Sequence, residues 1–228
     1  MIEHSDGRAN RIPLTPNRPV ADVTRDVLGA VGRLVGPVPI SLRPQEVPWS
    51  ARLDRDRDHQ TYDPAQVADY FTAATRAAMV LAALRAPYRG RSTPVNAWWG
   101  SFDLAVALFS GLPAEPRSQE FIARNSGDAE EIMVGWWPGD ARHPRAAFFA
   151  YASPAPPSFR DGIVSPPAAR WDSQLDEYVL EWDDVIASPD PHATALAFGR
   201  SVVAHACIVC HWDPRLAASA HGAPPPVS

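Results

Sequence analysis

The spacing of apolar residues predicts three main helices along the chain. Apolar residues recur at intervals of three and four positions across residues 19–35, and a Gly-Pro pair follows them. The second helix, residues 63–86, begins with an Asp-Pro pair, which is a strong N-terminal helix signal. The third extends from about residue 191 to residue 212. Apolar stripes of this kind are typical of helices that pack into a hydrophobic core.

Between the second and third helices, the pattern changes to one typical of β-strands. The segments there are rich in aromatic and β-branched residues, and Gly and Pro separate them. Their short spacing favours an antiparallel sheet over βαβ units. The sequence therefore predicts an α+β fold, with an antiparallel sheet of Trp-rich strands packed against about three main helices. We expect strands at residues 38–42, 94–100, 101–111, 130–137, 145–153 and 177–182, with the last one at the sheet edge.

The same pattern predicts one domain with two unstructured ends. We expect residues 13–216 to form a single α+β domain. Residues 1–12 are polar, and residues 217–228 end in a proline-rich tail, so both segments are expected to be disordered.

Composition excludes several classes of function. Of the 228 residues, 46% are hydrophobic, which is enough for a substantial core. The net charge is −5 and no basic block stands out, so nucleic-acid binding is not expected. The longest charged run, residues 52–58, alternates in sign and is interpreted as a solvated loop. All 21 basic residues are arginine, which excludes Schiff-base chemistry and a lysine-dependent phosphate loop.

The sequence also indicates an origin and a compartment. Its richness in Ala, Arg and Pro favours a GC-rich bacterial genome. We see no signal peptide and no apolar run of about 18 residues, so we expect a cytoplasmic protein without a membrane span. The two cysteines should then be reduced rather than disulfide-bonded.

One candidate metal site follows from the segment HACIVCHW. Cys207, Cys210 and His211 have the C-x-x-C-H order of a covalent haem site, and the same residues can begin a zinc site. On a helix they offer at most three ligands, and a haem of this type requires export. We therefore favour buried cysteines that act as small apolar residues, and we expect no cofactor.

A second candidate site is aromatic. Tryptophans beside a hydroxyl and a carboxylate are typical of small-molecule pockets, because indole rings combine large apolar area with one polar atom. If residues 99–103 form a regular strand, alternate side chains share one face. Ser101, Asp103 and Glu130 are the candidate catalytic groups, with the two carboxyls as acid and base. The candidate ligand-binding residues are Trp98, Trp99, Ser101, Asp103, Trp136, Trp137 and Tyr151.

Several blocks of this sequence resemble those of a known family. They include STPVNAWWGSFDLAVALFSG, YDPAQVADYF, GWWPGD, AAFFAYASPAPPSFRD, LDEYVLEWDDV and HWDPRLA. From about residue 11 the chain resembles a bacterial family described only as domain of unknown function 5996. The resemblance implies kinship and no particular activity. It also implies that this chain lacks an N-terminal strand-rich part, and that family histidines are replaced at Asn96 and in the segment 128–130.

Three functional hypotheses follow. The first is a small-molecule-binding domain with a Trp-lined pocket around residues 98–99 and 136–137. The second is a non-catalytic interaction protein, a truncated and degenerate relative that covers an exposed sheet face by forming a homodimer or by binding another chain. The third is a hydrolase-like enzyme that uses Asp103 and Glu130.

Overall fold

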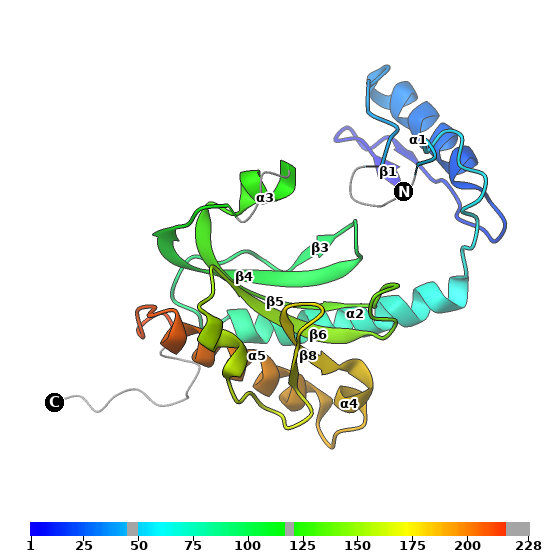
Figure 1. Ribbon diagram of the computed structural model, residues 1–228. Helices are drawn as coiled ribbons and strands as arrows, with labels where there is room; N and C mark the ends of the chain where they lie inside the picture. The colour runs from blue at the N-terminus through cyan, green and yellow to red at the C-terminus, as the bar shows by residue number, and fades with distance from the viewer. Residues whose placement is uncertain (45–49, 117–120, 218–228) are drawn as a thin grey trace. The chain divides into compact units, whose positions relative to one another are not determined.

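The computed structural model describes residues 1–44, 50–116 and 121–217, with only the backbone at residues 121–123. The chain divides into two compact units, Met1–Phe71 and Thr72–Ser228 (Figure 1). The predicted boundaries of one domain over residues 13–216 stay a prediction. Most of the expected tail, residues 218–228, lies outside the described residues.

The first unit contains one long helix and a small strand pair. Strands β1 (Ile2–Glu3) and β2 (Ala9–Asn10) pair in antiparallel fashion, within the segment that was expected to be disordered. Helix α1 spans Val20–Val35, as predicted. Residues 38–42, expected as a strand, form none. Helix α2 (Pro64–Arg85) begins in this unit and continues into the second.

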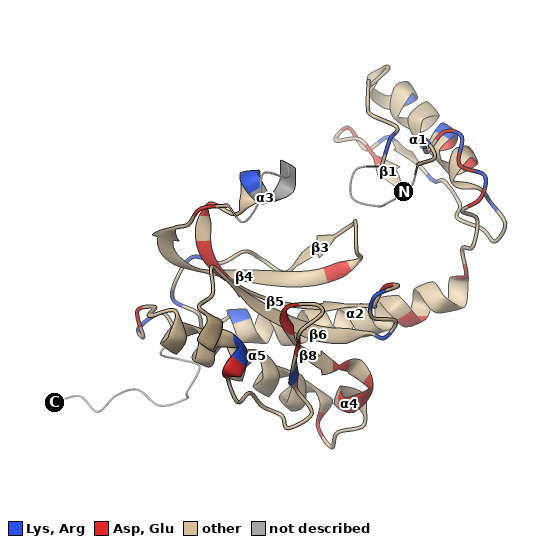
Figure 2. Cartoon of the chain, viewed as in Figure 1, with Lys and Arg blue, Asp and Glu red and all other residues tan. Residues whose placement is uncertain are grey.

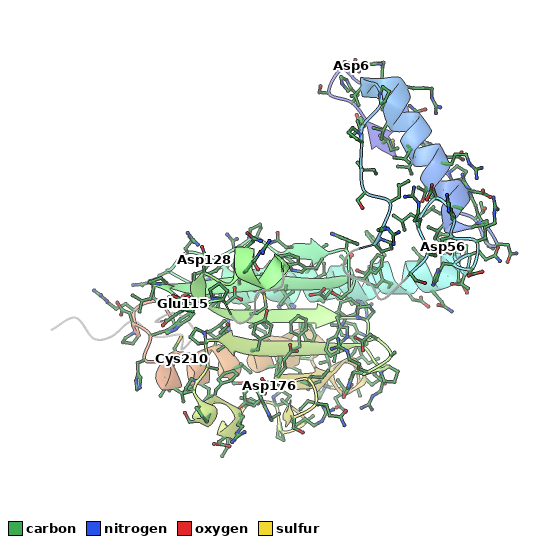
Figure 3. The ribbon with its side chains drawn as sticks, turned by 45° about the horizontal axis from the view of Figure 1, so that its top comes forward. Asp6, Asp56, Glu115, Asp128, Asp176 and Cys210 are labelled. Carbon is green, nitrogen blue, oxygen red and sulfur yellow. The ribbon has the colours of Figure 1, made fainter. Side chains whose placement is uncertain are left out.

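The charged run 52–58 is not simply a solvated loop. Asp56, labelled in Figure 3, is only 1% exposed. Its carboxylate accepts backbone N–H groups from Asp58 and His59 and lies 2.7 Å from His59 Nδ1. A buried carboxylate is tolerated when it is hydrogen-bonded in this way, so the alternating run contains one structural anchor.

The second unit is built on a six-stranded antiparallel sheet with the order β3-β4-β5-β6-β8-β7. The α+β prediction is confirmed. The strands are β3 (Asn96–Trp98), β4 (Asp103–Pro113), β5 (Ala129–Trp137), β6 (Ala147–Ser153), β7 (Arg170–Asp172) and β8 (Glu177–Glu181). The helices are the second part of α2, α3 (Phe121–Ser126), the 3₁₀ turn η1 (Pro157–Asp161), α4 (Trp182–Ile186) and α5 (Pro191–Val209).

Two strand predictions were wrong in their details. Residues 177–182 were expected at the sheet edge, but β8 lies between β6 and β7. β7 has three residues, which is too short to produce a periodic signal. Residues 99–102 were expected to continue a strand, but they form the turn between β3 and β4, where Trp98 pairs with Asp103.

Helices α2 and α5 lie against one face of the sheet, which we call the helix face (Figure 1). Val134 belongs to this face, because a Cβ added to Gly199 of α5 would lie 3.5 Å from its Cγ1. Gly199 also allows α5 to approach α2, since the same Cβ would lie 2.8 Å from Leu84 Cδ2. Val106 and Ala150 pair with Val134 in the ladder and therefore share this face.

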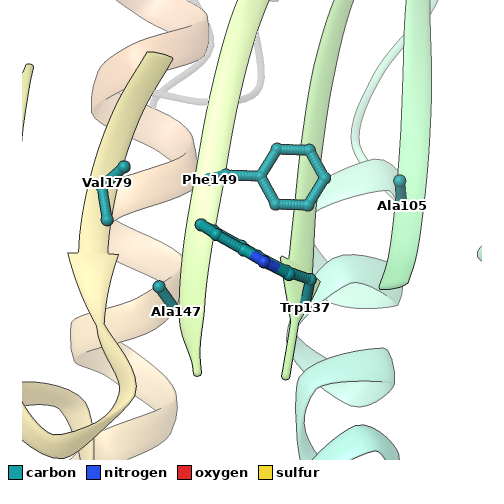
Figure 4. Packing of buried hydrophobic residues seen from close by; sticks show 5 residues of the cluster. All are labelled: Ala105, Trp137, Ala147, Phe149 and Val179. Carbon is teal, nitrogen blue, oxygen red and sulfur yellow. The ribbon is translucent and has the colours of Figure 1, made fainter. Parts of the chain in front are cut away.

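The opposite face of the sheet carries a smaller apolar cluster. Its side chains stand on the side of the strands away from α2 and α5 (Figure 4). Partly buried Met133, Tyr151 and Leu175 pack against it. The cluster therefore buries apolar area on the face opposite α2 and α5. Its members are Ala105, Trp137, Ala147, Phe149 and Val179.

Gly135 makes this packing possible, because the Phe149 ring lies directly over it. We predict that Gly135→Ala destabilises the protein by about 1–3 kcal/mol, as is typical of overpacking. The added Cβ would lie 2.3 Å from Phe149 Cζ and 2.6 Å from the Leu104 carbonyl oxygen. The measurement is the urea midpoint of unfolding.

The control for this prediction is Gly32→Ala in α1. Nothing lies within 4 Å of a Cβ at that position, and alanine favours the helix by about 0.5–1 kcal/mol. Equal midpoints for Gly135→Ala and the parent protein would show that Phe149 does not pack as described.

Candidate functional site

The structure separates the residues of the predicted aromatic site. Trp98 and Trp99 lie at and beyond the end of β3, and both are exposed, as is Phe102 in the same turn. Trp136 and Trp137 are consecutive residues of β5, so their side chains lie on opposite faces. Trp137 belongs to the cluster opposite the helix face, and Tyr151 packs against that cluster. The four tryptophans therefore do not line one common pocket.

Trp136 is fully buried on the helix face. Its ring packs edge-on against Trp182 of α4, with the ring centroids 5.7 Å apart, and Trp182 also lies 6.0 Å from the Phe148 ring. Edge-to-face pairs of this kind are favourable beyond their buried area. Trp136 thus supports a neighbouring aromatic surface rather than contacting solvent itself.

Asp103 and Ser101 are brought together, as the sequence suggested. The Ser101 hydroxyl donates a hydrogen bond to the Asp103 carboxylate at the β3–β4 turn. Burial raises the pKa of Asp103, and the serine hydroxyl opposes that effect. Asp103 therefore has a perturbed carboxyl group, one feature found at functional sites.

The expected acid–base pair is not brought together. Asp103 precedes Leu104, which pairs with Trp136 at one end of the β4–β5 ladder. Glu130 precedes Glu131, which pairs with Phe109 towards the other end. At roughly 3.3 Å per residue this separates them by about 20 Å. Glu130 Oε2 is buried and has no hydrogen-bond partner in the part of the chain that the structure describes. The two carboxyls cannot act on one reacting group.

Asp103→Asn should reveal the raised pKa of Asp103. A carboxyl whose pKa is raised by folding stabilises the protein only below its unfolded pKa, and this contribution is lost as the pH rises through the folded pKa. We predict that the melting temperature of the variant, relative to the parent, increases progressively as the pH rises above about 4. A thermal-melt series at constant ionic strength tests this. A difference that does not change with pH would contradict it.

The C-x-x-C-H segment does not form a metal cluster. Cys207 is buried near the end of α5, Cys210 caps that helix, and exposed His211 follows with a φ of 57° (Figure 3 labels Cys210). Both thiols are free. Among the described residues, no group of three His, Cys, Asp or Glu side chains is placed to hold a metal ion. The helix ends before His211, so the three side chains do not share one helical face.

Burial makes both thiols poor nucleophiles. It raises the pKa of Cys207 to about 11, with a smaller effect from Cys210, and it also raises the pKa of Cys210. At pH 8, roughly one Cys207 in a thousand is then a thiolate, which is the reactive form. This environment is the reverse of that of redox-active cysteine pairs, whose thiol pKa is lowered.

We predict that iodoacetamide at pH 8 alkylates Cys210 before Cys207 in the native protein. Cys207 is 7% exposed and Cys210 is partly exposed. Peptide mass spectrometry over a time course measures the order, and the same reaction in guanidinium chloride is the control in which the two rates converge. Faster modification of Cys207 would contradict its described burial.

The two positions at which the resemblance implies replaced histidines are also far apart. Asn96 pairs with Ala105, which in turn pairs with Gly135, whereas Ala129 pairs with Pro113 at the far end of the ladder. Asp128 lies just before β5 (Figure 3). Histidines at residues 96 and 129 would therefore not meet within this sheet.

A groove that the sequence analysis missed lies on the helix face. It has a volume of about 320 Å³, and most of its lining is apolar. α2 contributes Arg76, Met79 and Val80, which fall on one side of a helix because they are three and four residues apart. The remaining lining residues are Phe148, Trp182, Val185, Ile186, Asp190, Pro191, His192 and Ala195.

The groove depends on how α4 follows β8. The backbone N–H of Trp182 donates to the Ala146 carbonyl at 2.9 Å, and the chain then turns directly into α4. Trp182, Val185 and Ile186 all line the groove, since their spacing places them on one side of the helix. No local motif signals this site, because its walls come from three parts of the chain that are distant in sequence: α2, β6 and the α4–α5 segment.

A buried charged network on the other face was also missed. Glu181, at the end of β8, has Oε2 3.0 Å from Nε2 of buried His143. Its Oε1 accepts a hydrogen bond from Arg145 and forms an ion pair with Arg170. The His143 ring packs against Trp137. The network connects β7 and β8 with the loop before β6. Only the tertiary structure pairs His143 with Glu181, which lies 38 residues further along the chain.

Two other hollows are less suited to ligands. One holds about 20 Å³ beside Tyr88 and Leu84. The other, about 360 Å³, is a more open depression over Ser165, Ser201 and small residues of α5. The groove on the helix face combines sufficient volume with aromatic side chains in its lining, which is typical of small-molecule sites.

Comparison with known proteins gives one match. The model of a family described as "Family of unknown function (DUF5996)" matches residues 1–219. No curated protein and no solved structure matches the chain. The expected absence of an N-terminal strand-rich part stays a prediction.

Two helices, α2 and α5, are long and apolar enough to cross a membrane by length and composition. Both also contribute residues to the core, and core helices of soluble proteins commonly pass the same test. The cytoplasmic location and the absence of a membrane span stay predictions.

Proposed function

We propose that this chain, which belongs to the family of unknown function DUF5996, is a small-molecule-binding protein whose ligand occupies the groove over Phe148 and Trp182. The groove itself is the observation that carries the proposal. Its volume of about 320 Å³ falls within the range of about 300–1,000 Å³ that is usual for ligand sites. We do not place the ligand on Trp98 and Trp99, because they are exposed and separated from Trp136.

The lining of the groove favours an apolar, partly aromatic ligand. Trp182 is partly exposed and presents aromatic surface, and its ring packs against the buried rings of Trp136 and Phe148. Met79 and Ile186 are large apolar residues that remain 62% and 48% exposed, so a bound molecule would remove their surfaces from water. Burial of apolar area stabilises a complex by roughly 25 cal/mol per Å² before the loss of ligand freedom.

Two alternative functions have less support. An interaction protein is consistent with the exposed aromatic turn of Trp98, Trp99 and Phe102, but nothing identifies its partner. Catalysis by Asp103 together with Glu130 is not proposed, because these residues lie at opposite ends of the ladder.

The first test uses the neutral fluorescent probe N-phenyl-1-naphthylamine. We predict saturable binding to the native protein and at least a tenfold higher Kd for the double variant Met79→Glu/Ile186→Glu. Two carboxylates would occupy a surface that is apolar in the parent, and a tenfold change corresponds to about 1.4 kcal/mol. Fluorescence titration measures the Kd.

The matched control is Ile208→Glu. Ile208 is an exposed isoleucine, 72% accessible, on α5 and outside the groove lining. It should bind the probe like the parent, and all variants should melt within a few degrees of it because the changed residues are exposed. Equal probe binding by the groove variant and Ile208→Glu would overturn the proposed function.

A further inference from the structure

We infer that the groove selects a small apolar molecule that carries an anionic group, such as a carboxylate or sulfonate, and that Arg76 is the residue that binds this group. The inference rests on the proposed function and deepens it. It follows from the charges of the residues that line the groove, of which only two carry a full charge at neutral pH: Arg76 and Asp190.

The Asp190 carboxylate is already engaged by the protein. It is the N-cap of α5, and its Oδ1 accepts the backbone N–H of Ala193 at 3.0 Å. An N-cap carboxylate offsets unpaired N–H groups and the positive end of the helix dipole. Asp190 therefore has a structural role that accounts for its charge without a ligand.

Arg76 has no such role. It is exposed on α2, and no hydrogen bond or ion pair joins its guanidinium to another residue in the described ranges 1–44, 50–116 and 121–217. This differs from Arg142 and Arg145, each of which binds a carboxylate at 2.7–2.9 Å. A guanidinium at the wall of an apolar groove can donate two parallel hydrogen bonds to a carboxylate or sulfonate.

The other polar features of the groove agree with an anion. His192 lines it in the first turn of α5, and an imidazole N–H can donate a hydrogen bond to an anion. The acidic residues of α4, Asp183 and Asp184, are exposed and do not line the groove (Figure 2 shows acidic residues on α4). A ligand's anionic group near Arg76 would thus meet one unpaired cation, while the apolar body covers Met79 and Trp182.

A matched pair of probes separates the contribution of the ligand's charge to binding from the contribution of its apolar body. 8-Anilino-1-naphthalenesulfonate is N-phenyl-1-naphthylamine with one added sulfonate. We predict that Arg76→Gln raises the Kd of the sulfonate probe at least fivefold and changes that of the neutral probe less than twofold. We also expect the affinity of the parent for the sulfonate probe to fall between 20 and 500 mM NaCl, because salt screens an exposed ion pair.

The control variant is Arg89→Gln, which removes an exposed arginine outside the groove lining. It should leave both Kd values unchanged. If Arg76→Gln binds both probes like the parent while Met79→Glu/Ile186→Glu still loses the neutral probe, the anion inference is overturned and the proposed function stands. If the groove variant loses neither probe, both fall. Equal losses of the sulfonate probe in Arg76→Gln and Arg89→Gln would show a general charge effect and also overturn the inference.

Discussion

The packing of aromatic residues on the helix face is the interaction on which the rest of the second unit depends. Trp136 is fully buried there and contacts Trp182, and Trp182 in turn packs near Phe148. These rings connect the centre of the sheet to α4, and Trp182 and Phe148 line the groove. Without this contact, the short helix α4 would have little apolar area to hold it against the sheet, because it is only five residues long.

The candidate functional site lies on one face of the sheet, and the other face has a structural role. The helix face carries the main core and the groove, where the Arg76 guanidinium has no partner among the residues that the structure describes. The opposite face is held by the cluster around Trp137 and Phe149 and by the Glu181 network. In that network a buried carboxylate is satisfied by His143 and two arginines, which is the usual condition for burying a charge. We therefore interpret it as a structural connection between strands.

The residues that suggested metal binding or catalysis in the sequence have structural explanations in this fold. Cys207 is a buried thiol whose pKa is raised by burial, as expected for a cysteine that acts as a small apolar residue. Ser101 and Asp103 hydrogen-bond to each other at a hairpin turn. The perturbed pKa of Asp103 is compatible with function, but Glu130 is too distant to be its partner. The groove has no comparable sequence motif, yet it is the better-formed candidate site.

The sequence by itself determined the fold class and most elements, because periodicity of apolar residues reports which side of a helix or strand is buried. It predicted α1, α2, α5 and the central strands β4, β5 and β6 close to their observed positions. Only the tertiary structure decided that β8 is an inner strand, that residues 99–102 turn, and that Trp136 and Trp137 serve opposite faces. It also decided the site: the groove joins side chains from α2, β6, α4 and α5, and distances between such residues depend on packing, which local patterns do not encode.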